Sequence, residues 1–383
     1  MAELIYLDNN ATTRVADEVL AAMTPFYREH YGNPHAIHLL GRRAHDSVEA
    51  SRAEIAQFLE CATSEVIFTS CGTEGNAMVI RGLLDRHPER RKIVTTAVEH
   101  PSVLTLLRAL ERASLIELAV VPVDTEGVID LERMNHEIDD DTLLVTVMLA
   151  QNETGVVHPV ARIAAMAHER GAHVHVDAVQ AAGKIAVSQR ELGADFITIS
   201  GHKFHAPKGI GALTIRKGIA LQPLWYGGGQ ELGMRSGTEP VPAIAGLAAA
   251  ARLAREALPS YDRVRALRDR LEAAIRERVD EVSVNGATQT RIGNTASIAF
   301  HDAQADEIVR ALDAEGVCVS AGAACHSGNV EPSVTMKAMG KPLREAMGVV
   351  RFSLSRYTTA EEIDRTIGIT HQVVTKLRAA VQA

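Results

Sequence analysis

The chain has 383 residues, enough for a large core and two domains, and its 46% hydrophobic and 23% charged residues are typical of a soluble globular protein. Its 40 basic and 48 acidic residues give a formal net charge of −8, so no basic surface points to nucleic acid or anionic lipid as a partner. No apolar run approaches the ~18 residues of a transmembrane helix, and the first apolar run begins at residue 4, which leaves no room for a signal peptide and predicts a cytoplasmic protein.

The predicted elements begin with a short strand at residues 4–7 and a helix that starts at Asp17. A second helix is expected over roughly 46–59. From residue 65 onward, short apolar runs alternate with amphipathic stretches, which favours an α/β fold with a mostly parallel sheet and helices on both faces. The expected strands cover 66–69, 93–96, 143–148, 173–176, 196–199 and 212–215, and the expected helices cover about 75–84, 102–110 and 160–169.

A long helical region follows over 241–279, interrupted at Pro259, and it is interpreted as a connector between two lobes. Beyond it the pattern predicts strands at 281–284, 295–300, 317–320 and 349–354, a helix from Asp306 and a closing helix from Glu361 to about Val381. This part of the chain therefore predicts a smaller α+β domain.

The strand predicted at 196–199 ends in Ser200-Gly201-His202-Lys203. A lysine just past a buried strand is poorly solvated, and desolvation favours its neutral, nucleophilic amine. That form of Lys203 is the one that bonds to an aldehyde such as pyridoxal phosphate. The alternative is an ordinary surface lysine.

Other polar residues also follow predicted strands. Gly72 allows close backbone approach, and Thr73 is expected to cap a helix whose N-terminus attracts phosphate, the alternative being a plain capped helix. An imidazole at His100 is placed to stack on a cofactor ring and to carry protons, or merely to cap a helix. Eight such residues lie just past five strand ends, which predicts one shared site: Thr73, His100, Asn152, Asp177, Gln180, Ser200, His202 and Lys203.

His173-x-His175-x-Asp177 places three side chains on one face of a strand. One interpretation is a metal site of two histidines and a carboxylate. The other is that Asp177, at the strand end, pairs with the protonated ring nitrogen of pyridoxal phosphate. Because a metal needs ligands that converge from several directions and none is evident, we expect no metal.

Two loops and one arginine complete the set of candidates. The polar, glycine-rich stretch from Gly227 to Thr238 either binds phosphate or is simply flexible. Cys325 lies among small residues at 320–328 and, since the four cysteines form no C-x-x-C pair, it is expected to be a reactive thiol rather than part of a disulfide. Arg351 lies within an apolar strand and is expected to bind a carboxylate.

Together these motifs resemble those of the cysteine desulfurases of the nitrogen-fixation and iron–sulfur-assembly type, pyridoxal-phosphate enzymes of fold type I in the class V aminotransferase group. The resemblance covers nearly the whole chain. The motifs are Leu7-Asp8-Asn9-Asn10-Ala11-Thr12-Thr13, Gly32-Asn33-Pro34, Glu99-His100-Pro101, Asn152-Glu153-Thr154-Gly155, Asp177-Ala178-Val179-Gln180, Ser200-Gly201-His202-Lys203, Arg235-Ser236-Gly237-Thr238 and Arg351-Phe352-Ser353-Leu354-Ser355-Arg356.

The resemblance implies two domains, a large pyridoxal-phosphate domain over 16–255 and a small domain made of 1–15 plus 256–383 that carries the cysteine loop. It implies that L-cysteine is converted to L-alanine, that a persulfide forms on Cys325, and that the sulfur passes to an acceptor or iron–sulfur scaffold protein. Members of the family are homodimers, and Thr238 is expected to reach the phosphate in the partner subunit.

The resemblance also implies the role of each site residue. Lys203 bonds the cofactor and, with His100 and Cys325, is catalytic. Asp177 contacts the ring nitrogen and His100 stacks on the ring. The other implied cofactor contacts are Gln180 and Asn152 near the phenolic oxygen and Gly72, Thr73, Ser200, His202 and Thr238 around the phosphate; the implied substrate contacts are Arg351, Asn152 and Asn33.

The cysteine loop departs from the family pattern. Ala321 and Ala323 stand where serines are usual, and His326 stands where Ser or Thr is common. Two alternative functions remain open at this point. A selenocysteine lyase, or another pyridoxal-phosphate lyase or aminotransferase, would keep Lys203 without needing Cys325. A non-enzymatic sulfur-transfer scaffold would need neither residue.

Overall fold

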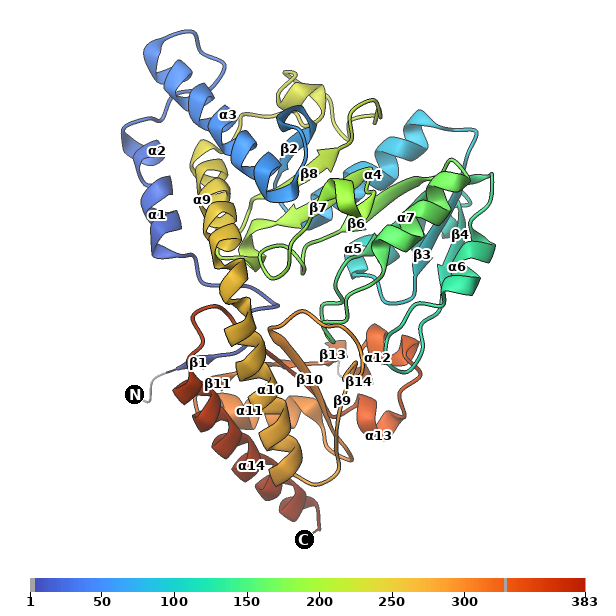
Figure 1. Cartoon of the computed structure of the whole chain (residues 1–383), viewed down its shortest axis with the longest axis vertical. Coiled ribbons are helices and arrows are strands. Elements are labelled where there is room, and N and C mark those ends of the chain that lie inside the picture. The colour runs from blue at the N-terminus through green and yellow to red at the C-terminus, as the bar shows by residue number, and fades with distance from the viewer. Residues whose placement is uncertain (1–3, 327–328, 383) are drawn as a thin grey trace.

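A computed structural model of the chain describes residues 4–326 and 329–382; the side chains of 323–326, 329, 330, 381 and 382 are outside the description. Figure 1 shows a sheet-containing part at the top and a smaller part below, with the long helices α9 (Val241–Ala257) and α10 (Tyr261–Arg278) running from one to the other. Among the helices described, none combines the length and the apolar character that a membrane crossing requires.

The large sheet has seven strands. In spatial order they are β2 (Val66–Thr69), β8 (Gly211–Ile215), β7 (Phe196–Ser200), β6 (His173–Asp177), β5 (Thr142–Met148), β3 (Lys92–Thr96) and β4 (Glu117–Val121). The pairs from β7 to β4 are parallel, whereas β8 is antiparallel to both of its neighbours. β2 therefore runs in the same direction as β7, and the chain leaves every strand except β8 at the same edge of the sheet. This edge is where a ligand site is expected in such a fold.

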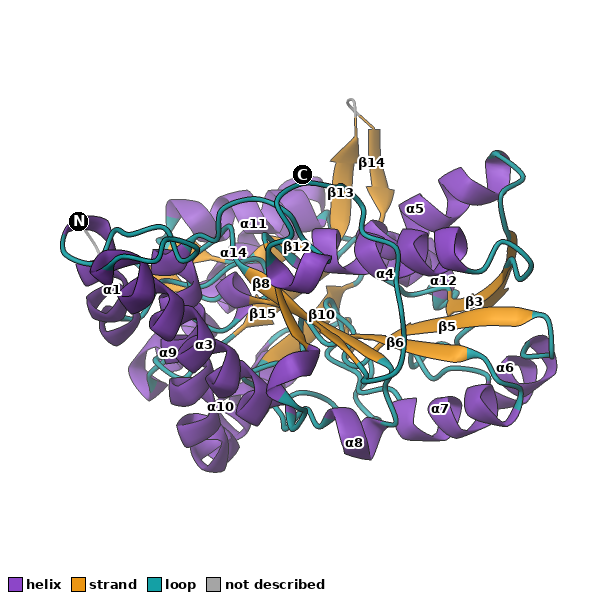
Figure 2. Ribbon diagram, turned by 90° about the horizontal axis from the view of Figure 1, so that it is seen from above, coloured by secondary structure: helices purple, strands orange, loops and turns teal. Residues whose placement is uncertain are grey.

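Alternate residues along each strand pack into different cores, because successive side chains point to opposite faces of a sheet. In β7, Ile197 and Ile199 belong to one core and Phe196 to the other. The first core includes side chains of α1 (Asp17–Met23), α3 (Leu39–Leu59), α7 (Val160–Glu169) and α9; the second includes side chains of α4 (Gly72–Arg86) and α5 (Pro101–Arg112). Figure 2 shows this sheet edge-on between the two helical layers.

The smaller part has its own apolar core, built around a four-stranded antiparallel sheet. Its strand order is β12 (Ser320–Ala321), β15 (Val349–Ser353), β10 (Thr295–Phe300) and β9 (Val282–Val284). α10, α11 (Ala305–Ala314) and α14 (Ala360–Gln382) pack against it. The remaining helices are α2 (Pro25–Arg28), α6 (Leu131–Glu137), α8 (Gln189–Leu192), α12 (Val334–Ala338) and α13 (Leu343–Ala346), with short 3-10 turns at Thr63–Glu65, Gly201–Lys203, Glu231–Gly233 and Leu258–Ser260.

The N-terminal segment connects the two parts. β1 (Ile5–Tyr6) pairs in parallel with β11 (Val317–Cys318) in the smaller part. The turn that follows then enters the larger part, where Thr13 N donates to the carbonyl of His202 at 2.9 Å. Asn10 is held from several sides, since its Nδ2 donates to Thr295 Oγ1 at 2.8 Å and its Oδ1 accepts from Asn294 Nδ2 at 3.0 Å. The turn at 8–13 is thereby fixed between both cores.

The structure confirms the mostly parallel sheet, the helices on both faces and the helical break at Pro259, where α9 ends and α10 begins. Four details of the prediction were wrong. α3 begins at Leu39 rather than near 46, because His38 caps it by accepting from Gly41 N at 3.2 Å. β4 was not predicted, and β8 is antiparallel. The stretch predicted as one strand at 317–320 is divided between β11 and β12.

One hairpin was not predicted. β13 (Ala323–His326) pairs with β14 (Asn329–Pro332), with Cys325 opposite Val330. In Figure 2 this hairpin projects away from the rest of the molecule, on the side of α4 and α5. The Cys325 backbone is therefore part of a two-stranded ribbon, while its side chain lies outside the description.

Candidate active site

A cavity of about 200 Å³ lies at the carboxyl edge of the large sheet. Its lining comes from the segments that follow β2, β3, β5, β6 and β7, which are the five strand ends that the sequence indicated. Nine predicted residues line it: Gly72, Thr73, His100, Asn152, Asp177, Gln180, Ser200, His202 and Lys203. Cys71, Asn76, Ser102, Met148, Ala150 and Val179 complete the lining.

Lys203 ends the 3-10 turn that follows β7. Its Nζ donates to the carbonyls of Asn10 at 2.6 Å and Ala11 at 3.0 Å, both in the N-terminal turn. Burial and the nearby Arg351 guanidinium lower the pKa of Lys203 from 10.5 to about 8, although Asp177 and Asp8 oppose that shift. The amine is therefore neutral in a substantial fraction of molecules near neutral pH, the form in which it is nucleophilic.

Asp177 is the last residue of β6 and is buried. Its Oδ2 accepts from Asn76 Nδ2 at 2.8 Å and its Oδ1 accepts from the backbone N–H of Val179 at 3.0 Å. Two donors fix the plane of the carboxylate at one end of the cavity. The arrangement suits a carboxylate that has to receive a proton-bearing ring nitrogen.

The histidines upstream do not form a metal site with Asp177. Both ring nitrogens of His175 are within hydrogen-bond distance of threonine hydroxyls, Thr146 at 2.8 Å and Thr198 at 3.0 Å. Burial lowers the pKa of His175 to about 4, so the ring is neutral and structural. Within residues 4–326 and 329–382, no group of three or more His, Cys, Asp or Glu side chains is placed to hold a metal ion.

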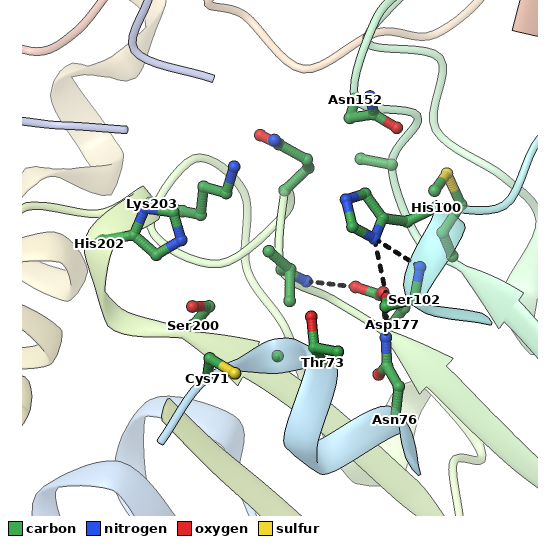
Figure 3. Close-up of a pocket in the computed structure, with 15 residues that line it drawn as sticks. Cys71, Thr73, Asn76, His100, Ser102, Asn152, Asp177, Ser200, His202 and Lys203 are labelled. Carbon is green, nitrogen blue, oxygen red and sulfur yellow. Dashed lines mark hydrogen bonds between the residues drawn. The ribbon is translucent and has the colours of Figure 1, made fainter. Parts of the chain in front are cut away.

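The other end of the cavity is suited to an anion. The N-cap residue of α4, Cys71 rather than Thr73, makes no side-chain hydrogen bond to the helix, so the first N–H groups of this 15-residue helix remain available. A Cβ on Gly72 would lie 2.8 Å from Cγ2 of Val179, so only glycine leaves this space open. Figure 3 shows Ser200 and His202 on this side of the cavity and Asp177 and His100 on the other, with Thr73 between them.

His202 contributes hydrogen-bonding capacity rather than charge. Burial and the neighbouring lysines, Lys203 first, lower its pKa to about 4. Its Nδ1 lies 3.2 Å from the hydroxyl of Thr12. A neutral imidazole here still offers one ring N–H to an oxygen anion.

Gln180 lies three residues after Asp177, and its side chain is held at both ends of the amide. Its Nε2 donates to the carbonyl of Asn10 at 2.9 Å, and its Oε1 accepts from Lys184 Nζ at 2.9 Å. Lys184 is fully buried, and burial followed by repulsion from Lys203 and Arg351 lowers its pKa well below 10.5. These two hydrogen bonds fix the orientation of the Gln180 amide at the cavity.

His100 is the N-cap of α5, as its position before Pro101 indicated. The ring lines the cavity, yet burial by the surrounding protein lowers the pKa of His100 below 6.5. The charge of Lys203 lowers this pKa further, and the charge of Asp177 opposes the shift. Its Nδ1 lies 2.8 Å from the hydroxyl of Ser102 and accepts from the backbone N–H of Ser102 at 3.1 Å. The imidazole is thus fixed by the helix that it caps.

Arg351 lies on β15, beside the cavity rather than in its lining. Its Nη2 pairs with Asp8 Oδ1 at 2.9 Å, and its Nη1 donates to the carbonyl of Asn152 at 3.0 Å. The Nε of this buried guanidinium has no hydrogen-bond partner among the described residues. The prediction that Arg351 needs a carboxylate is thus met inside the chain by Asp8.

Two predicted residues, Asn33 and Thr238, are not brought to the cavity within this chain, and a third, Cys325, is not placed by the described side chains. Asn33 is exposed, and its Oδ1 accepts from the backbone N–H of His35 at 2.9 Å. Thr238 is exposed in the loop that precedes α9. The side chain of Cys325 lies outside the described residues, so its distance from the cavity is not defined.

The sequence analysis missed several residues that shape the cavity. Asn76 lies one helical turn after Thr73, a spacing that places both on the same face of α4. Ser102 lies two residues after His100, and Lys184 lies four residues after Gln180. These short spacings were the available signals. Asp8 gave none, because its partner Arg351 is 343 residues away in sequence.

The comparisons with known proteins agree with this geometry. Residues 5–366 match the family model described as aminotransferase class-V. The chain is 46% identical over 376 residues to cysteine desulfurase 2 of Trichormus variabilis, and the match covers 98% of this chain and 94% of that protein.

Solved structures are similar over almost the full length as well. A NifS-like protein matches with a TM-score of 0.92 and 36% identity, covering 98% of this chain and 100% of that one. SspA, solved in complex with cysteine, matches with a TM-score of 0.81 and 31% identity, covering 93% of this chain and 100% of that one.

Proposed function

The chain belongs to the aminotransferase class-V family and is a pyridoxal-phosphate-dependent cysteine desulfurase of fold type I, and we propose that it moves the sulfur of L-cysteine onto Cys325. In that reaction the carbon–sulfur bond of the substrate breaks, a sulfur–sulfur bond forms on the Cys325 thiolate, and a proton is added to the carbon, which leaves L-alanine. The sulfur then passes to an acceptor protein for iron–sulfur cluster assembly.

The observation that carries the assignment is the arrangement of groups along one cavity. An uncapped helix N-terminus lies at one end, a fixed carboxylate at the other, and a lysine with a lowered pKa is anchored beside them. Pyridoxal phosphate has a phosphate, an aldehyde and a ring nitrogen in the same relation. When bound, it supplies an electron sink for the substrate carbon.

Each predicted residue then has a role in holding this cofactor. The phosphate is bound by Gly72, Thr73, Ser200 and His202. These residues carry no formal charge, so they stabilise the negative phosphate through N–H and O–H donors. Asp177 keeps a proton on the ring nitrogen and His100 covers a ring face. Gln180, its amide fixed by Lys184, donates to the phenolic oxygen, with Asn152 beside it.

Lys203 would hold the cofactor through its aldehyde, and its amine would be placed to hold or move a proton at the substrate carbon. Its pKa of about 8 suits both tasks, because an amine with a pKa near the working pH is available in both protonation states. The carbonyls of Asn10 and Ala11 hold the free amine while it is not bonded.

Arg351 binds the carboxylate of the substrate. Asp8 pairs with the same guanidinium, so the buried positive charge has a negative partner within the chain. Asn152 contributes through its backbone carbonyl, which accepts from Arg351, and through its side chain at the cavity wall. Asn33 is proposed to complete the substrate contacts.

Cys325 is the sulfur acceptor within the chain. Support comes from its place on a ribbon that projects beside α5, because a carrier must reach both the cavity and an external acceptor (Figure 2). His326 follows Cys325 directly in sequence, and its side chain also lies outside the described residues.

We also propose the remaining organisation from the family. The protein is a homodimer in which Thr238, exposed in its own chain, completes the phosphate site of the partner subunit. Residues 16–255 form the cofactor domain, and 1–15 with 256–383 form the small domain, in line with the separate core of the smaller part. A cytoplasmic location is in line with the free thiols of the described cysteines, Cys61, Cys71 and Cys318.

The decisive experiment measures alanine and sulfide together when the holoenzyme is incubated with L-cysteine and a reductant. Equal amounts of the two products are expected. Cys325→Ser should retain the cofactor but form no persulfide. The matched control is Cys61→Ser, which removes a thiol just after the C-terminal end of α3 and should keep most of the activity. Desulfuration by Cys325→Ser at the wild-type rate would overturn the proposal.

A further inference from the structure

A chain of hydrogen bonds runs along the cavity wall from Asp177 to His100 (Figure 3). Asn76 Nδ2 lies 2.8 Å from Asp177 Oδ2 and 2.9 Å from Ser102 Oγ. Ser102 Oγ in turn lies 2.8 Å from His100 Nδ1. Three elements contribute, since Asn76 is on α4, Asp177 ends β6, and the other two residues begin α5.

The direction of each bond follows from what the groups can do. A carboxylate only accepts, so the amide atom that faces Asp177 is nitrogen, and the second proton of this nitrogen is directed to Ser102 Oγ. Ser102 Oγ thus accepts from Asn76, and its own proton is left for His100 Nδ1. The backbone N–H of Ser102, which can only donate, also points at this nitrogen from 3.1 Å.

His100 Nδ1 therefore receives two donors and must present its lone pair to them. In a neutral imidazole the proton is then on Nε2. We propose that Asn76 and Ser102 are positioning residues that hold His100 as the neutral Nε2–H tautomer, so that the ring offers the cavity a donor and not a base.

Protonation of the ring would oppose this arrangement. An imidazolium carries a proton on Nδ1 as well, and that proton would face the fixed N–H of Ser102 at the start of α5. The charged groups on the other elements do not compensate, because Lys203 opposes a positive ring and only Asp177 favours it. The direction of the pKa shift of His100, downward, agrees with a ring that stays neutral.

Asn76 supplies an independent reason to regard the network as selected for more than packing. Its side chain is fully buried, yet its Oδ1 has no hydrogen-bond partner among the described residues. A buried acceptor without a partner costs about 1–3 kcal/mol, and an apolar residue would remove that cost. What the asparagine provides, and leucine does not, is the pair of N–H groups directed to Asp177 and Ser102.

The chemical consequence rests on the proposed function: with Nε2 already protonated, His100 does not take a proton from the substrate, and this task falls to Lys203. The tautomer itself does not depend on the function. It is tested in the apoprotein, so failure of the tautomer and failure of the proposed reaction give different results.

The experiment is two-dimensional NMR of apoprotein labelled with ¹⁵N in its imidazole rings, with the His100 signals identified by their loss in His100→Gln. Between about pH 6 and pH 8 we expect Nδ1 to be unprotonated and Nε2 to be protonated. A proton on Nδ1, or a doubly protonated ring at neutral pH, would overturn the proposal whether or not any variant folds.

Variants test which residues hold the ring. Asn76→Leu and Ser102→Ala should each raise the fraction of His100 that carries a proton on Nδ1, and Ser102→Thr, which keeps the hydroxyl, should restore the wild-type spectrum. Thr105→Ala, on the exposed side of the same helix, is the matched control. Spectra of Asn76→Leu and Ser102→Ala that equal the wild-type spectrum would show that these side chains do not position the ring.

Discussion

The lowered pKa of Lys203 predicts how fast its amine reacts with any aldehyde, before the cofactor is present. A fall from 10.5 to about 8 raises the neutral fraction at pH 7 about 300-fold, to roughly 10%. The reaction of the apoprotein with formaldehyde and cyanoborohydride should therefore label Lys203 at a rate that rises about tenfold per pH unit and levels off above pH 8. Peptide mass spectrometry measures the label, with Lys208, exposed nearby, as the internal reference for the reagent.

The lowered pKa of Lys203 also makes the stability of the folded protein depend on pH. The unfolded chain holds the lysine proton up to about pH 10.5 and the folded chain only to about pH 8, so protonation favours the unfolded state between these values and below. The cost is about 3 kcal/mol below pH 8 and disappears as the pH rises towards 10.5. Lys203→Met should consequently raise the stability of the apoprotein at pH 7, measured by urea unfolding.

Arg351→Gln tests what lowers the pKa of Lys203. Burial is the largest contribution and Arg351 the next, so removal of the guanidinium should move the half-maximal pH of labelling upward without restoring it to 10.5. A wild-type profile with its midpoint near pH 10, or one that Arg351→Gln leaves unchanged, would refute the reasoning. Asp177→Asn gives the opposite control, since loss of that negative charge should move the midpoint downward.

Three further predictions follow from particular contacts. Asp8→Asn should lower the KM for L-cysteine, because the substrate carboxylate no longer competes for Arg351; an unchanged or higher KM in steady-state kinetics would contradict this. Lys184→Met should raise the pH at which the holoenzyme changes colour, because the Gln180 amide is no longer held as a donor to the phenolic oxygen. The unfolding temperature of the apoprotein should not fall. An unchanged pH of the colour transition would show that Lys184 has no such role. Gly72→Ala should raise the dissociation constant of pyridoxal phosphate at least about tenfold, because the added Cβ would lie 2.8 Å from the side chain of Val179. Equilibrium binding measured by fluorescence tests this, and a wild-type affinity would contradict it.

Sequence reasoning located most of the cavity because the relevant signal is local. In a parallel sheet each polar residue after a strand is brought to one edge, whatever the order of the strands. Thr73, His100, Asn152, Asp177 and Lys203 could thus be grouped without knowing which strand neighbours which. The antiparallel β8 did not disturb the grouping, since none of the residues grouped in this way comes directly after it.

What sequence reasoning could not predict depends on geometry or on distant parts of the chain. His38 caps α3 through a ring nitrogen, and histidine is not among the usual capping residues, so the helix was predicted to start too late. Asp8 and Arg351 meet only because the fold brings together two segments that are 343 residues apart in sequence. Asn76 gives a visible pattern only once the start of α4 is known to be Gly72.

The contacts of the N-terminal turn with the small sheet have a consequence for the order in which this protein is made. Asn9 finds its partner only after a long stretch of chain has been synthesised, because it bonds to Ser353 across 344 residues. At 5–20 residues per second, synthesis of the intervening chain takes roughly 20–70 s. Until then the turn at 8–13 is held by the large part alone, through bonds such as Thr13 N to the carbonyl of His202 and Gln180 Nε2 to the carbonyl of Asn10. Its second set of contacts, with β15, forms only after residues 349–353 have been synthesised, so the turn that holds Lys203 is fixed from both sides late in synthesis.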